Sequence, residues 1–206
     1  MVADHLEVEQ KFDVDEGFTR PDFGALRDVL HEEITGAEPA RYRLAATYFD
    51  TPDERLAANG ITLRRRTGGT DEGWHLKLPA GAGARREVHA PLDGGRGEVP
   101  PRLAAAVAEV TGGLPLAPIA ALDTERTVVT LTGHDGRVLA EIADDVVTAR
   151  RLGGAPGGRQ PLRWREIEVE VPARSPALQQ AAADLLRAAG ARPAGHGSKL
   201  ARLLGR

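Results

Sequence analysis

The sequence predicts an α+β fold: a closed eight-stranded antiparallel β-barrel that encloses a charged tunnel, with helices packed outside. In Glu7–Lys11 an ionisable residue occurs at every second position, and Glu166–Val171 repeats this alternation with three carboxylates. Successive side chains of a strand point to opposite faces, so each segment has a charged face and an apolar face. Short glycine-rich connectors such as Gly68–Gly73 favour hairpins between neighbouring antiparallel strands.

The first strand places Glu7, Glu9 and Lys11 on one face, with Leu6 and Phe12 on the other. Like charges on one strand face repel, and a second acidic row opposite them would repel more. We therefore expect a cation between the rows, and Mg²⁺ or Mn²⁺ suits such oxygen ligands. The alternative is that each acidic face lies at a sheet edge in water.

The remaining elements follow from periodicity and turn signals. The predicted strands lie at residues 4–13, 41–50, 61–67, 73–79, 85–91, 119–131, 137–150 and 162–171. Helices are expected at residues 21–32, 101–111 and 176–189, with a short final helix from about Ser198.

Most of the other strands also have one apolar and one charged face. Arg64 and Arg66 share a face, as do His75 and Lys77, whereas the apolar residues of the same strands fall opposite. An open sheet could place all these charges in water. We prefer a barrel with a polar interior, because helices can then cover the apolar outside. Each unpaired buried charge costs several kcal/mol, so the interior requires a highly charged ligand and its metals.

Composition limits the class of protein. The chain has 206 residues, of which 41% are hydrophobic and 28% charged, and it contains no cysteine. This predicts a single cytoplasmic globular domain over residues 1–206, without disulfides or thiolate zinc sites. The net charge of -3 does not favour nucleic acid, and no apolar stretch has the length of a membrane span. The six histidines form no metal cluster by spacing, and most are expected at the surface.

The balance of interior charges indicates the ligand. The inward-facing carboxylates nearly balance the inward-facing bases, so two divalent ions would leave the interior positive. A linear phosphate chain fits this balance, because arginine and lysine side chains bind phosphate oxygens well.

These motifs, in this order along nearly the whole chain, resemble the CYTH superfamily of triphosphate tunnel metalloenzymes. The superfamily is named from a bacterial adenylate cyclase and thiamine triphosphatase. The similarity is greatest to actinobacterial CYTH domain phosphatases in which this domain precedes a helical CHAD domain, a possible functional partner that is absent from this chain. The motifs are Glu7-x-Glu9-x-Lys11, Tyr48–Thr51, Leu63–Arg66, Trp74–Pro79, Arg85–Glu87, Glu125–Thr127, Glu141–Asp145, Glu166–Glu170 and Ser198–Lys199.

The resemblance implies roles for individual residues. The metal ligands would be Glu7, Glu9, Asp145, Glu166, Glu168 and Glu170. The phosphate-binding residues would be Lys11, Arg64, Arg66, Lys77, Arg85, Arg126 and Lys199. Glu87 and Glu141 would support these bases, and the catalytic set would be Lys11, Lys199, Glu7 and Glu9.

The expected activity is metal-dependent hydrolysis of a triphosphate, with inorganic tripolyphosphate preferred and two Mg²⁺ or Mn²⁺ ions as cofactors. Thiamine triphosphate hydrolysis and cyclisation of ATP need the same phosphate contacts and stay open. They would also need a site for the organic group, and the two large candidates for stacking, Trp74 and Trp164, are expected to pack in the core or on the outer face. A non-catalytic polyphosphate-binding module is the alternative outside the enzymes. A nucleic-acid 5′-triphosphatase is disfavoured by the net charge.

Overall fold

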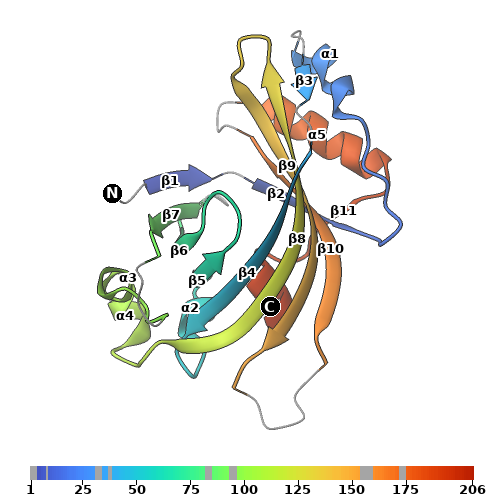
Figure 1. Ribbon diagram of the computed structural model, residues 1–206. Coiled ribbons are helices and arrows are strands. Elements are labelled where there is room, and N and C mark those ends of the chain that lie inside the picture. The colour runs from blue at the N-terminus through green and yellow to red at the C-terminus, as the bar shows by residue number, and fades with distance from the viewer. Residues whose placement is uncertain are drawn as a thin grey trace.

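A computed structural model describes residues 4–7, 9–30, 34–36, 39–81, 85–92, 97–153, 160–171 and 175–206, with only the backbone described at 4–7, 29–30 and 35–36. Its dominant feature is one antiparallel sheet, which contains eleven strands within these residues. The hydrogen-bonded order is β1-β7-β6-β5-β4-β8-β9-β10-β2-β11, with β3 paired to β8 (Figure 1). The strands are β1 (Asp4–Glu7), β2 (Glu9–Val14), β3 (Ile34–Gly36), β4 (Ala40–Asp50), β5 (Thr62–Thr67), β6 (Gly73–Pro79), β7 (Arg85–Ala90), β8 (Ala117–Gly133), β9 (Val138–Arg151), β10 (Leu162–Glu170) and β11 (Arg192–Pro193).

The predicted closed eight-stranded barrel is wrong, because the sheet is open. Its path begins at β1 and ends at β11, and within the described residues no ladder joins these two edges. The described residues of the first predicted strand form two strands, β1 and β2, with different partners. β1 pairs with β7, whereas β2 pairs with β10. The two strands therefore belong to different parts of the sheet, which we call its wings: one is formed by β1 and β5 to β7, the other by β2 and β8 to β10.

All eight predicted strand segments contain a strand, and β3 and β11 were not predicted. In its described part, residues 21–30, the expected helix at 21–32 is a 3₁₀ turn followed by an α-helical segment, and residues 31 and 32 lie outside the described residues. The short helix α2 was missed. The helices are η1 (Phe23–Leu26), α1 (Arg27–Leu30), α2 (Arg55–Ala58), α3 (Pro101–Ala106), α4 (Ala108–Thr111), α5 (Pro176–Ala188) and α6 (Lys199–Leu204). None of these helices is both long enough and apolar enough to cross a membrane.

Helix α5 covers the apolar face of one end of the sheet. Pro176 occupies its first turn, where a missing N–H costs nothing. Leu178, Ala182 and Leu186 recur on one stripe and are fully or almost fully buried in a cluster with the side chains of β2, β9 and β10. Burial of this apolar stripe drives helix and sheet together, and it leaves the charged side chains of the same strands on the opposite face.

Helices α2, α3 and α4 cover the other wing, where Leu56 and Leu103 pack with Trp74, Leu63 and Leu76 of β5 and β6. A third cluster places Leu200 of α6 against strands β8 to β10. Helices α2 to α5 therefore cover apolar faces of the sheet, as predicted. Helix α6 differs from the prediction, because Leu200 packs on the face that carries the charged pocket residues, beside Tyr48 and Leu122.

Candidate functional site

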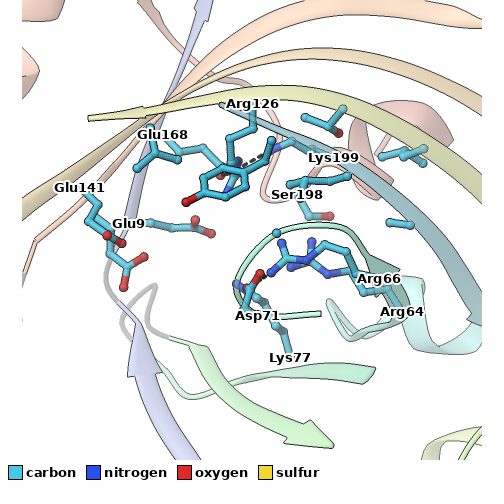
Figure 2. A pocket seen from close by; sticks show the side chains of 18 of the residues that line it. Glu9, Arg64, Arg66, Asp71, Lys77, Arg126, Glu141, Glu168, Ser198 and Lys199 are labelled. Atoms are coloured by element: carbon cyan, nitrogen blue, oxygen red, sulfur yellow. Dashed lines mark hydrogen bonds and ion pairs between the residues drawn. The ribbon is translucent and has the colours of Figure 1, made fainter. Parts of the chain in front are cut away.

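The concave face holds a polar cavity of about 260 Å³, lined by both wings of the sheet. Figure 2 shows Arg64, Arg66 and Lys77 on one side of this pocket, with Glu168 and Lys199 across from them. Alternate side chains of β2 and of β4 to β10 point toward the cavity, so the position of a residue along its strand decides whether it lines the cavity. The basic lining side chains are Lys11, Arg64, Arg66, Lys77, Arg85, Arg126 and Lys199, and the acidic ones are Glu9, Asp71, Glu87, Glu141, Glu168 and Glu170.

A group of three carboxylates, Asp145, Glu166 and Glu168, lies at the side of the pocket formed by β9 and β10. We call it the acidic cluster. Glu166 is the register partner of Asp145, and Glu168 lies two residues further along β10 on the same face. Each residue offers a ligand oxygen, and these oxygens lie within 4.8 Å of one another. The side chain of Asp145 is fully buried and that of Glu168 is 13% exposed.

Lys199 supplies the acidic cluster with a positive charge. Its Nζ lies 2.9 Å from Asp145, 2.7 Å from Glu166 and 2.7 Å from Glu168. The position of this ammonium follows from the start of α6, where the hydroxyl of Ser198 accepts a hydrogen bond from the N–H of Ala201. Burial would lower the pKa of Lys199, but the charges of the three carboxylates outweigh burial and raise it well above the usual value.

Two further bases contact Glu168. Arg126 donates from Nη2 to Glu168 at 2.6 Å and binds Asp145 through two nitrogens, at 2.7 and 2.6 Å. Lys11, the register partner of Glu168, also donates to it, and lies 3.1 Å from Glu9. Burial opposes the charge on Lys11, yet Glu168 and Glu9 raise its pKa. The acidic cluster and these bases thus form one buried network of opposite charges.

The opposite side of the pocket is a basic wall, formed by Arg64, Arg66, Lys77 and Arg85 of β5 to β7. Among the described residues, Lys77 lies 3.4 Å from Glu87. Arg64 donates weakly to the hydroxyl of Tyr48 at 3.4 Å, and Arg66 pairs with Asp71. The Nε atoms of Arg64 and Arg66 are buried and have no hydrogen-bond partner among the described residues. Burial, with the charges of Arg64 and Arg126, lowers the pKa of Arg66 to about 9.

The structure brings together most of the residues predicted for the site, while their roles stay predictions. Asp145 and Glu166 lie behind Lys199 and Arg126, and all the predicted bases line the pocket. Glu141 lies at the rim and accepts from Thr130 at 3.5 Å. The backbone of Glu7 lies opposite Arg85 in β1, but its side chain is outside the described part of the chain.

Sequence reasoning missed three contributors to the pocket. Trp164 is a core residue as expected, but its indole N–H also donates to Glu166 at 2.5 Å. Asp71 lies in a turn that the sequence marked only as a connector. Most histidines were expected at the surface, and His75 was given no role, yet it is 3% exposed and contacts Glu87. Its position on the charged face of β6, next to Lys77, was the available signal.

The charge network predicts a loss of stability in acid. Burial would raise the pKa of Glu168, but Lys11, Lys199 and Arg126 hold it well below its usual value, and Lys199 and Arg126 lower that of Asp145. A carboxylate whose pKa falls on folding contributes stability that is complete above its unfolded pKa, about 4, and is lost as pH falls through the folded value. We expect the Tm, measured by circular dichroism, to fall steeply below about pH 4.

The control for this prediction is Glu168→Gln, which removes the titrating group. The variant should be less stable than the wild type near neutral pH and should show a shallower fall of Tm in acid. Identical acid profiles for the two proteins would contradict the assignment.

Comparisons with known proteins identify the family of the chain. The family model of the CYTH domain matches residues 5–203. The uncharacterized protein Rv2226 of Mycobacterium tuberculosis is 45% identical over 214 residues, which cover 98% of this chain. The chain spans 41% of the length of that curated relative.

Solved structures share the fold at low sequence identity. A Bacillus halodurans protein described as a candidate adenylate cyclase is 19% identical, with a TM-score of 0.60 and 97% of each chain covered. HpAC1 from Hippeastrum, a candidate adenylyl cyclase with a dominant triphosphatase activity, is 16% identical, with a TM-score of 0.53 and 97% of this chain and 95% of that chain covered. The predicted resemblance is confirmed, and the chain belongs to the CYTH domain family.

Proposed function

We propose that this chain hydrolyses a triphosphate, that its substrate is inorganic tripolyphosphate, and that it requires a divalent cation. The observation that carries the proposal is the basic wall. Arg64 and Arg66 each have a buried, unpartnered Nε within the described residues, and burial disfavours the charge on Arg66. An unsatisfied buried donor costs about 1–3 kcal/mol, and more for a charged group. A polyanion with several oxygen acceptors would remove this cost.

The size of the pocket supports an inorganic substrate. At about 260 Å³ the cavity is smaller than the roughly 300–1,000 Å³ typical of sites for drug-sized organic ligands. Its lining is dominated by charged side chains, whereas a site for a nucleoside or a thiamine group is expected to be mainly apolar or aromatic. Tripolyphosphate needs only the charged part of such a site.

The acidic cluster fits a hard divalent cation. Its donors are all carboxylate oxygens, close enough to share one ion, and such ligands suit Mg²⁺ or Mn²⁺. We propose two ions, with Glu7, Glu9 and Glu170 completing the ligands. When bound, they would neutralise phosphate charge and lower the pKa of a coordinated water.

The chain's own bases would then bind and orient the phosphates. Lys11, Arg126 and Lys199 reach the pocket from the side of the acidic cluster, and the basic wall reaches it from the other side. Bases fixed on both sides would stabilise the negative charge that spreads over the phosphoryl oxygens during transfer. The scheme needs no nucleophilic side chain, since water attacks the phosphorus.

The test is release of orthophosphate from tripolyphosphate with Mg²⁺ or Mn²⁺, beside ATP, thiamine triphosphate and pyrophosphate as competing substrates. We expect tripolyphosphate to give the highest kcat/KM, and Asp145→Asn to lose at least about 100-fold in kcat while still binding tripolyphosphate. The triphosphatase activity of HpAC1 supports the reaction class. Higher kcat/KM for an organic triphosphate would reject the proposed substrate.

A non-catalytic polyphosphate-binding module is the second candidate. It is favoured by Lys199 and Arg126, which already neutralise much of the acidic cluster without a metal. The same assay separates the two functions: tight binding of tripolyphosphate without turnover, under every divalent ion, would favour the module.

A further inference from the structure

His75 lies between the turn that follows β5 and the basic wall. Its Nδ1 is 2.5 Å from Oε1 of Glu87, and its Nε2 is 2.9 Å from the backbone carbonyl oxygen of Asp71. Both ends of the imidazole therefore face oxygen acceptors. The ring is 3% exposed, so water does not replace either contact.

The protons of this arrangement can be counted. A neutral imidazole has one N–H and one bare nitrogen. The contact with the carbonyl of Asp71 requires a hydrogen on Nε2, and the short contact with Glu87 requires a second hydrogen between Nδ1 and Oε1. A neutral ring beside an ionised carboxylate would leave one contact without a hydrogen. Hydrogen bonds at both contacts therefore need two hydrogens, shared between His75 and Glu87.

Each partner of His75 also contacts a base of the basic wall. Glu87 lies on β7 with its Oε2 3.4 Å from Nζ of Lys77, and the side chain of Asp71 pairs with Arg66. His75 thus fixes the neighbours of two bases without contacting the pocket ligand itself.

Further groups that face His75 come from β5 and β7. Arg64 and Arg66 lie across from it on β5, and His89 lies on β7, with ring centroids 4.8 Å apart. Gly73 leaves room for His89, since a Cβ there would lie 2.3 Å from its Nε2. Burial lowers the pKa of His75 to about 4 against the effect of Glu87, and Arg64 and Arg66 lower it further. An anion bound to Arg64 and Arg66 would offset their positive charges. It would therefore stabilise the proton shared by His75 and Glu87.

We propose that His75 is a positioning residue of the pocket, which shares a proton with Glu87, holds the Asp71 turn, and so fixes the neighbours that orient Lys77 and Arg66 for a polyphosphate ligand. The inference rests on the proposed function, because it assumes that the basic wall binds phosphate. It adds that binding of tripolyphosphate is coupled to the proton shared by His75 and Glu87.

The first test is ¹⁵N NMR of the histidine rings in the free wild-type protein, which requires no variant and no turnover. We expect the Nε2 of His75 to carry a hydrogen at about pH 7, with Nδ1 in a strong hydrogen bond to a carboxyl group. A ring with a bare Nε2, or a bare Nδ1 without a shared hydrogen, would overturn the proposal, whatever the protein hydrolyses.

The second test measures tripolyphosphate binding by calorimetry without divalent metal, so that no turnover occurs. His75→Phe should weaken binding about tenfold, because Lys77 and Arg66 lose their fixed neighbours. His75→Asn can still donate to Glu87, and His75→Gln can still donate to Asp71, so each should recover part of the loss. The matched control is His89→Asn on β7, which should bind like the wild type.

Several readouts distinguish positioning from a merely structural role. Under turnover conditions the His75 variants should show a raised KM with little change in kcat, at an unchanged Tm for the Asn or Gln variant. Equal affinity of all three His75 variants and the wild type would overturn the role. Failure of the proposed hydrolysis is distinguishable, because the wild type would then bind tripolyphosphate and hold the shared proton without releasing phosphate.

Discussion

Replacement of Lys199 by methionine is expected to lower the free energy of unfolding by about 3–5 kcal/mol and to abolish turnover of tripolyphosphate. The ammonium lies within 2.9 Å of all three members of the acidic cluster, two of which are almost completely buried. Methionine keeps most of the length of the side chain but leaves those carboxylates short of one positive charge. Urea denaturation followed by circular dichroism would measure the loss.

Arg150→Met is a matched control, because Arg150 is an exposed base on β9 outside the pocket lining. It should change stability by less than about 0.5 kcal/mol and leave turnover intact. In the Lys199 variant, Mg²⁺ or Mn²⁺ should restore more stability than in the wild type, because the ion would meet the same carboxylates without a competing ammonium. Equal stability of the two variants would contradict the central position that we assign to Lys199.

Arg66→Met is expected to weaken binding of the ligand without lowering the stability of the protein. Binding of tripolyphosphate should weaken by about 10- to 150-fold, since a hydrogen bond to a charged group contributes about 1.5–3 kcal/mol. Stability in the absence of ligand should stay the same or increase, because the fold disfavours the charge of this buried guanidinium and its partner Asp71 is largely exposed. Calorimetry would give the affinity, and thermal unfolding the stability.

Arg65→Met tests whether the loss of affinity depends on the face of the strand. Arg65 precedes Arg66 in β5 and points to the opposite side of the sheet. It should keep the affinity of the wild type. If both variants lost affinity equally, a general effect of net charge would explain the result better than a phosphate contact at Arg66.

Alternation along the strands predicted much of the site. It placed Arg64 and Arg66 on one face, and Lys11, Arg126 and Glu168 toward a common interior, which the register of β2, β8, β9 and β10 confirms. The pattern works because the side-chain period of a strand is fixed by backbone geometry. It says which face a residue occupies, whatever its partners are.

The openness of the sheet and the contacts of single side chains could not be predicted in this way. Alternation in residues 4–13 is the same whichever strands lie beside the segment, so it did not reveal that β1 pairs with β7 and β2 with β10. The hydrogen bonds of Trp164 and His75 depend on which strand lies beside them and on the path of a turn. Both are set by pairings between distant parts of the chain.

The split of the N-terminal segment between two wings also constrains the order of assembly during synthesis. Lys11 meets Glu168 across 157 positions of sequence, and its strand has its main partner in β10. A nascent chain must therefore release almost its whole length from the ribosome before β2 can pair and α6 can bring Lys199 to the carboxylates. Such nonlocal pairing folds slowly, and the unpaired edge of β10 is exposed until the first residues return to it.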